Sequence, residues 1–401
     1  MNFTPPLPKD NEGKIFSELL LLAEKVCIES AKLNCIHNKH VVHSIKELLR
    51  KVNSYYSNKI ESEGTHPIDI ERAMKQDFEV DEHRRNLQEL SLVYIEVQRY
   101  IEKLSKDEHN NFYTKEFVLD VHYQFYSKKE MLPFLKIKKD KESSEFITMK
   151  AGQFRETDVA IGRHKAPSSE ILNSLFNEYE SFYKLYPYMT QATKLVYAIS
   201  SHHRLTWLHP FLDGNGRTSR LVLDGLLQHM NLDGYGLWNI SRGLARNTKG
   251  YQEYLAQADM VRQGNLDGRG VLSTKGLRVY VKFMLETALD QIAFMNESLK
   301  LETLSNRIEN FVEFSQKNMY TNQKPLPKYS ELLLKALLVQ GEIPRGKVKS
   351  IINKETKTAS TLIRNLIDLE YIESDTSKSP IRLKFNSFFA SKIFPELIPS
   401  L

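Results

Sequence analysis

A stretch at residues 209–220, HPFLDGNGRTSR, constrains this chain more than any other feature. Residues 191–207 before it and 217–230 after it carry apolar side chains at three- and four-residue steps, which is the periodicity of amphipathic helices. Gly214 and Gly216 lack a Cβ, so the backbone can turn and direct successive N–H groups inward at the start of the second helix. The sequence therefore predicts a loop between two helices that binds an anion.

The charged residues of this loop suit phosphate chemistry. Arg217 and Arg220 are three residues apart on one helix, so both guanidinium groups can bind phosphate oxygens. Asp213 offers a hard oxygen ligand, which suits Mg²⁺ bridging phosphates. His209, with an ordinary pKa of about 6.5, can take a proton from a hydroxyl at neutral pH. A base, a carboxylate for a metal and an anion site together indicate nucleotidyl or phosphoryl transfer.

Other interpretations of the loop are open at this point. Glycines and an asparagine with nearby arginines are often only a turn. His202, His203 and His209 suggest zinc, but no cysteine or glutamate completes a HExxH or CxxC pattern around them. A P-loop is excluded because GxxxxGK[ST] is absent.

The stretch resembles the signature of the Fic family, HPFx(D/E)GNGRxxR, and matches it at every specified position. The resemblance implies a mainly α-helical bundle that moves AMP from Mg·ATP onto a Ser, Thr or Tyr hydroxyl of a protein and releases pyrophosphate. It implies that His209 is the base and that Asp213 holds Mg²⁺. The α- and β-phosphates would be held by Gly214, Asn215, Gly216 and Arg217, and the γ-phosphate by Arg220. Branches with lysine at the second glycine act as phosphotransferases, so Gly216 favours AMP transfer.

Residues 136–167 differ in character from the helical segments around them. ITMKAGQFRETDVAIGRHKAP contains glycines, alternating residue types and β-formers, which predicts a two-stranded hairpin. The hairpin is similar to the Fic flap, here 152–167, which positions a target segment by backbone pairing. A surface hairpin without a role is the alternative. The resemblance places three flap residues beside the nucleotide, namely Ile161, Gly162 and Arg163.

The segment 245–259, ARNTKGYQEYLAQAD, resembles the Fic segment whose tyrosine pair approaches the adenine. Here the pair reads Tyr251 and Gln252, which departs from the family pattern. Tyr251 is the expected nucleotide contact. Tyr254 is expected either to contact the ligand or to pack in the core.

A second motif, SNKIES, lies at residues 57–62. Ser57 and Glu61 are four residues apart and share one helix face. Such a pair is commonly just a solvated helix end, but the segment resembles the Fic inhibitory motif (S/T)xxxE(G/N). The resemblance implies that Glu61 pairs with Arg220 and excludes the γ-phosphate. Ser62 stands where the family has Gly or Asn, and because this position often needs a positive φ, the helix end is predicted at Gly64 instead.

The domain organisation follows from the helical periodicity and its interruptions. An N-terminal helical region, residues 1–110, would carry the inhibitory helix, and the Fic core would span 111–304, ending in a helix over 277–304. A linker is predicted at 305–328, where polar residues and prolines accumulate. Residues 329–401 show three short helices followed by a hairpin, which resembles a small winged helix.

The winged-helix-like unit gives only a weak basic footprint for DNA. Lys354, Lys357 and Arg364 lie on its third helix and the lead-in, but Asp368 and Glu370 offset them. DNA binding, protein docking and a structural role therefore stay open.

Composition sets the remaining bounds. The chain has 401 residues, a net charge of +6 and two cysteines, Cys27 and Cys35, which are too few for a disulfide framework and are expected to be buried small hydrophobes. The start lacks the apolar run of a signal peptide, and no stretch is apolar enough to span a membrane, so a soluble cytoplasmic protein is expected.

Three functions follow as hypotheses. The first is a protein adenylyltransferase autoinhibited by Glu61. The second keeps the site but removes AMP from a modified protein, with Glu61 orienting a water. The third is a nucleotide-sensing regulator that binds DNA. The expected partners are ATP and a protein target, including the enzyme itself, with DNA and a second copy of the chain as further candidates.

Overall fold

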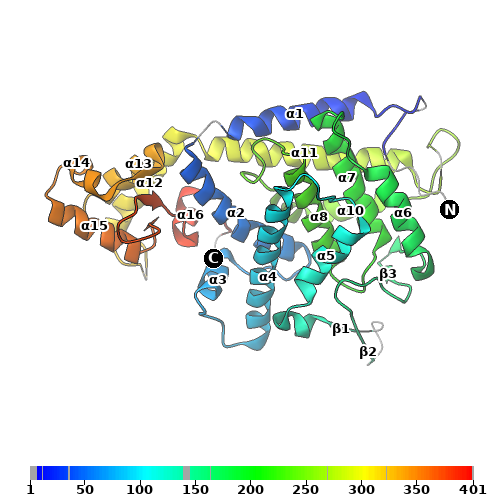
Figure 1. The fold of residues 1–401 in the computed structure, drawn as a ribbon, viewed down its shortest axis with the longest axis horizontal. Coiled ribbons are helices and arrows are strands. Elements are labelled where there is room, and N and C mark those ends of the chain that lie inside the picture. Colours follow the sequence, from blue (N-terminus) through cyan, green and yellow to red (C-terminus); the bar gives the residue numbers. More distant parts are fainter. Residues whose placement is uncertain are drawn as a thin grey trace.

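The computed structural model describes residues 7–10, 12–34, 37–138, 145–162, 164–268, 270–321 and 323–399. It is mainly α-helical, as expected from the sequence (Figure 1). The N-terminal region contains α1 (Ser17–Leu33), α2 (Lys39–Ile60), α3 (Pro67–Met74) and α4 (Glu82–Ser105). No helix in the described part of the chain is long and apolar enough to cross a membrane.

The central bundle follows α4 in the sequence. Its helices are α5 (Lys115–Tyr126), α6 (Leu172–Tyr183), α7 (Gln191–Leu208), α8 (Asn215–His229), α9 (Ile240–Arg246), α10 (Thr248–Ala258) and α11 (Thr274–Ser298), with 3₁₀ turns η1 (Lys129–Phe134) and η2 (Ser169–Ile171). Side-chain caps start several of them: the Thr190 side chain accepts a hydrogen bond from the Thr193 N–H at α7, and Thr114 does the same for Phe117 at α5. The long helices α1 and α11 run side by side along one edge of the bundle (Figure 1).

Two short antiparallel hairpins leave the bundle between α5 and α6. The first pairs β1 (Lys136–Lys138) with β2 (Phe146–Thr148), and the second pairs β3 (Ala160–Ile161) with β4 (His164–Lys165). In the second hairpin Ile161 is opposite His164 and Ala160 is opposite Lys165. The predicted flap at 152–167 thus contains a hairpin, although its paired strands are shorter than the sequence suggested.

The expected 305–328 linker is wrong over its first half, residues 305–316, which are helical. The predicted helix over 277–304 is instead interrupted at Leu299 and Lys300, and α12 (Leu301–Gln316) begins there. Polar residues hid the helical periodicity of its buried side chains, which are Leu304, Ile308, Phe311 and Val312. Helix α12 packs against α13 and α16 of the C-terminal unit, and residues 317–329 connect it to α13.

The C-terminal unit alternates helices with short strands. Its elements are α13 (Ser330–Gln340), β5 (Glu342–Ile343), η3 (Arg345–Lys347), α14 (Val348–Ile351), α15 (Thr356–Asp368), β6 (Ile372–Glu373), β7 (Ile381–Leu383) and α16 (Ser387–Ile393). The strands form one antiparallel sheet in the order β5-β7-β6. The sequence predicted the three helices and the β6–β7 hairpin but neither β5 nor α16.

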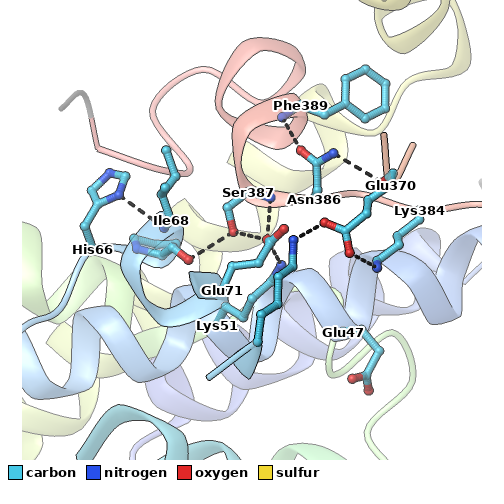
Figure 2. A network of polar contacts seen from close by, with 12 residues as sticks. Glu47, Lys51, His66, Ile68, Glu71, Glu370, Lys384, Asn386, Ser387 and Phe389 are labelled. Atoms are coloured by element: carbon cyan, nitrogen blue, oxygen red, sulfur yellow. Dashed lines mark hydrogen bonds and ion pairs between the residues drawn. The ribbon is translucent and has the colours of Figure 1, made fainter. Parts of the chain in front are cut away.

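A buried polar joint fixes the C-terminal unit to α2 and α3 (Figure 2). The Glu71 carboxylate on α3 accepts hydrogen bonds from Lys51 Nζ on α2 at 2.6 Å and from Ser387 N and Oγ, at the start of α16, at 2.7 and 2.6 Å. Two further contacts hold α2 itself: Ser44 Oγ donates to the Leu383 carbonyl at 2.6 Å and Tyr56 OH to the Leu397 carbonyl at 3.2 Å. The unit therefore contacts α2 along much of its length.

Candidate active site

The loop between α7 and α8 has the tight geometry that its glycines predicted. His209 ends α7 in the left-handed region at φ 46°, and Gly214 precedes α8 at φ 76°. A Cβ on Gly214 would lie 2.3 Å from Tyr126 OH, so only glycine fits. The Asn215 amide accepts from Phe211 N at 2.9 Å and donates to Phe211 O at 2.8 Å, so this side chain braces the loop.

His209 lies at the mouth of the site in a partly desolvated position. Burial, and then the nearby positive groups of His164 and Arg155, lower the pKa of His209 from 6.5 to about 4. Arg155 Nε donates to the His209 carbonyl at 2.8 Å, and Arg155 N donates to the Pro210 carbonyl at 2.8 Å. The imidazole is therefore neutral at pH 7, the state in which it can accept a proton.

Arg217 is buried in the first turn of α8 with every guanidinium nitrogen engaged. Nε and Nη2 donate to Tyr126 OH at 3.1 and 2.8 Å, and Nη2 also contacts Asp213 Oδ2 at 3.3 Å. Nη1 pairs with Glu63 Oε2. Burial alone would lower the pKa of Arg217, but Tyr126, Asp213 and Glu63 together raise it.

Arg220 lies one turn deeper and meets the N-terminal motif. Its Nε donates to Ser57 Oγ at 2.8 Å, and its Nη2 donates to the Ser57 carbonyl at 3.0 Å and to Glu61 Oε1 at 2.8 Å. Burial would raise the pKa of Glu61, but the neighbouring Arg220 and Arg217 outweigh that effect and lower it. The structure thus brings Glu61 and Ser57 onto the arginine to which the family resemblance pointed.

The end of α2 differs from the sequence expectation. The helix stops at Ile60, and Ser62, not Gly64, takes the left-handed conformation at φ 65°. Ser62 N donates to Lys59 O at 3.0 Å and Glu63 N to Asn58 O at 2.9 Å, which is a Schellman motif. Serine occupies the position that glycine usually fills, because these two hydrogen bonds satisfy the carbonyls at the end of the helix.

Asp213 is the side chain best placed for a metal. Its side chain is 43% exposed, and among the described residues only its Oδ2 has a polar contact, to Arg217 Nη2. Within the described residues no three His, Cys, Asp or Glu side chains gather into a metal site. Mg²⁺ commonly takes one or two carboxylates together with substrate phosphates and water, so Asp213 could serve as such a ligand.

The residues expected to line the nucleotide from the flap and from α10 differ in their exposure. Ile161 is 44% exposed at the hairpin tip, and Gly162 follows with φ 58°. Arg163 lies outside the described residues. Tyr251 is buried in the bundle, with its hydroxyl 2.9 Å from His202 Nε2, which differs from an open adenine contact. Tyr254 is half-buried and stacks on Phe283 with ring centroids 4.3 Å apart.

Sequence reasoning missed the residues behind the loop. His122 stacks on Phe211 at 3.7 Å between ring centroids, accepts from Gly152 N at 2.9 Å and donates to the Asp213 carbonyl at 3.3 Å. Burial lowers its pKa to about 3, so it is neutral and joins the base of the flap to the loop. His122 and Tyr126, four residues apart on α5, were the available signal, but nothing in the sequence tied that face to the loop.

A histidine, a carboxylate and two arginines at the start of one helix of a helical bundle form a site of the kind that suits binding a phosphate. Comparison with known proteins agrees with this class. Residues 113–227 match the Fic/DOC family model, so this part of the chain is similar to Fic/DOC domains. The match lies within the 111–304 core expected from the sequence.

Two curated relatives are similar over the same region. "Protein adenylyltransferase Fic" from Aedes aegypti is 39% identical over 80 residues, which is 20% of this chain and 16% of that protein. "Protein adenylyltransferase Fic" from Nematostella vectensis is 32% identical over 115 residues, 28% of this chain and 24% of that protein. The chain thus matches a quarter or less of the length of these relatives.

One solved structure shows that the fold extends beyond the family match. A Fic domain containing signaling protein from Bacteroides thetaiotaomicron aligns with a TM-score of 0.51 at 14% identity, covering 70% of this chain and 97% of that one.

Proposed function

We propose that this chain is a protein adenylyltransferase that moves AMP from Mg·ATP to a protein hydroxyl and that its structure is the inhibited state. The observation that carries the proposal is the α8 start, where a neutral His209, an exposed Asp213 carboxylate and two buried arginines meet. The likeness to proteins named adenylyltransferases supports the same reaction.

The residues divide the reaction among them. His209 takes the proton of the target hydroxyl as its oxygen bonds to the α-phosphorus, and the bond to pyrophosphate breaks. Arg217, the N–H groups at the start of α8 and Arg220 stabilise the phosphate charge. Asp213 would hold Mg²⁺, which neutralises phosphate charge when bound. Ile161 and the paired backbone of the flap would align the target segment.

Glu61 would keep the described state inactive. Arg220 presents a fixed set of donors, and a phosphate needs the same donors that Ser57 and Glu61 now occupy. The γ-phosphate and Glu61 therefore compete for one guanidinium. A penalty of about 1.4 kcal/mol for breaking the pair lowers the population of the productive nucleotide pose about tenfold.

The test compares labelled AMP incorporation by the parent, Glu61→Gly, Arg220→Ala and the double variant at equal concentration. We expect Glu61→Gly to transfer AMP about tenfold faster or more, including onto the enzyme itself, and Arg220→Ala to be slow in either background. The control is Glu24→Gly on the exposed face of α1. Incorporation by Glu61→Gly at or below the parent level would reject inhibition by Glu61.

Removal of AMP from a modified protein is the alternative reaction of the same site. Glu61 Oε1 is held by Arg220, whereas Oε2 has no hydrogen-bond partner among the described residues, so it is free to orient a water. Water would attack the phosphorus, and AMP and the protein hydroxyl would be released. Loss of AMP from a modified substrate with the parent, but not with Glu61→Gly, would favour this activity.

The C-terminal unit supports a second candidate function, nucleic-acid binding. Its element order is that of a winged helix, and the exposed face of α15 carries Lys357 and Arg364, neither of which has an ion-pair partner among the described residues. Fluorescence anisotropy with duplex DNA should show binding that weakens steeply with salt and is lost in Lys357→Ala with Arg364→Ala. Equal binding by this double variant would exclude the α15 face.

A further inference from the structure

The turn after α2 directs two carboxylates, not one, at the start of α8. Glu61 ends the helix, and the left-handed Ser62 reverses the chain so that the Glu63 N–H returns to Asn58 O. This reversal places the Glu63 side chain beside Arg217, while Glu61 meets Arg220. Arg217 and Arg220 are therefore each paired with a different glutamate, and both glutamates come from the turn after α2.

The Arg217–Glu63 and Arg220–Glu61 pairs block different parts of the proposed nucleotide site. Arg217 is in the first turn of α8 and contacts Asp213, the candidate Mg²⁺ ligand, so it lies nearest the phosphates that a metal would bridge. Arg220 lies one turn further along the helix and has no contact with Asp213. Because Glu63 occupies Nη1 of Arg217 and Tyr126 occupies Nε and Nη2, Arg217 cannot bind a phosphate without giving up a partner.

The Glu63 partner is the one that can be given up. The Glu63 side chain is 30% exposed, against 3% for Arg217, so its carboxylate can turn into water, where it is fully hydrated. Tyr126, by contrast, is fully buried and cannot withdraw without opening the core. Release of Arg217 therefore takes place through Glu63.

We propose that Glu63 is a second inhibitory residue, which blocks Arg217 independently of Glu61 and so excludes nucleoside diphosphates as well as triphosphates. This rests on the proposed nucleotide site and extends its regulation. Glu61 competes only with a γ-phosphate, which ADP lacks, whereas Glu63 competes at the arginine next to the metal, which ADP and ATP both need. Neutralising Glu61 alone thus leaves the Arg217–Glu63 pair in place.

The experiment measures dissociation constants for Mg·ADP and Mg·ATP by calorimetry, which needs no catalysis. The proteins are the full chain, Glu61→Gln, Glu63→Gln and the double variant, with Glu24→Gln on α1 as the matched control. If the pair leaves Arg217 free in about one molecule in ten, Glu63→Gln tightens ADP about tenfold. Glu61→Gln leaves ADP unchanged and tightens only ATP, and the double variant binds ATP most tightly.

An ADP dissociation constant for Glu63→Gln equal to that of the parent would overturn the proposal. The substitution keeps the turn, because the Glu63 backbone N–H and not its side chain closes the helix end. A second measurement uses salt: raising ionic strength from about 0.05 M to about 0.5 M should shrink the ratio of parent to Glu63→Gln ADP constants, since the pair is partly exposed. A ratio independent of salt contradicts a charge pair.

The outcome separates this inference from the proposed function. If Glu61→Gly transfers AMP but Glu63→Gln leaves ADP affinity at the parent value, the second block is rejected and the enzyme assignment stands. If Glu63→Gln tightens ADP but no variant transfers AMP, the nucleotide block stands and the transferase assignment is rejected.

Discussion

His209 illustrates how much a residue's surroundings change its chemistry. The residue type alone suggests a base that titrates near pH 6.5, but burial and the positive groups around it bring its pKa to about 4. Arg155 donates hydrogen bonds to the carbonyls of His209 and Pro210, so the backbone that carries the ring is fixed at the start of the loop. The neutral form that can accept a proton therefore persists well below neutral pH.

This gives a prediction for the pH dependence of AMP transfer. A base with a lowered pKa stays deprotonated as pH falls, so the rate of Glu61→Gly should be nearly flat from about pH 8 to about pH 5, with no inflection near 6.5. His209→Ala should lose about 10²- to 10⁴-fold in rate over the whole range. Labelled AMP incorporation as a function of pH measures the rates of both variants. A rate for Glu61→Gly that falls below about pH 6.5 would show that the pKa of His209 is not lowered.

At the scale of elements, α2 connects the site with the C-terminal unit. Its last turn and the turn that follows it contact Arg220 and Arg217. Lys51, in the middle of α2, belongs to the joint with α3 and α16 (Figure 2). Burial alone would raise the pKa of Glu71, but the Lys51 ammonium and the two donors of Ser387 outweigh it and lower the pKa. The joint therefore depends on an ionised Glu71.

We predict that Glu71→Gln lowers thermal stability and loosens α2. Removing the charge leaves the Lys51 ammonium, 10% exposed, without its partner, which costs about 3 kcal/mol. Because the folded pKa of Glu71 is below 4.5, the ion pair stabilises the parent above that pH and is lost as pH falls further, so the parent should approach the variant in acid.

Thermal unfolding and hydrogen exchange of residues 39–60 measure this effect. The matched control is Glu253→Gln, whose pair with Lys249 is 3.9 Å long and exposed, and which should leave the unfolding temperature unchanged. An equal unfolding temperature for Glu71→Gln and its parent at neutral pH would show that the joint contributes no stability.

At the scale of the whole molecule, the sequence predicts best what is local. The 209–220 loop, its flanking helices and the hairpin region follow from glycines, charges and periodicity within short windows. Glu63 could not be recognised in this way, because its role depends on Ser62 accepting a left-handed conformation that serine usually avoids. The hydrogen bond from Ser387 N to Glu71 joins residues 316 positions apart, which no local pattern relates.

The anchoring of α2 also has a consequence for biosynthesis. Ser44 and Tyr56 are fixed by the carbonyls of Leu383 and Leu397, which are 339 and 341 residues away in the chain. A ribosome adding about 5–20 residues per second needs on the order of ten seconds or more to pass from the end of α8 to Leu397. During that interval a nascent chain already contains the 209–220 loop but lacks the carbonyls that hold α2. The rate of translation therefore sets how long each new molecule exists with that helix only partly secured.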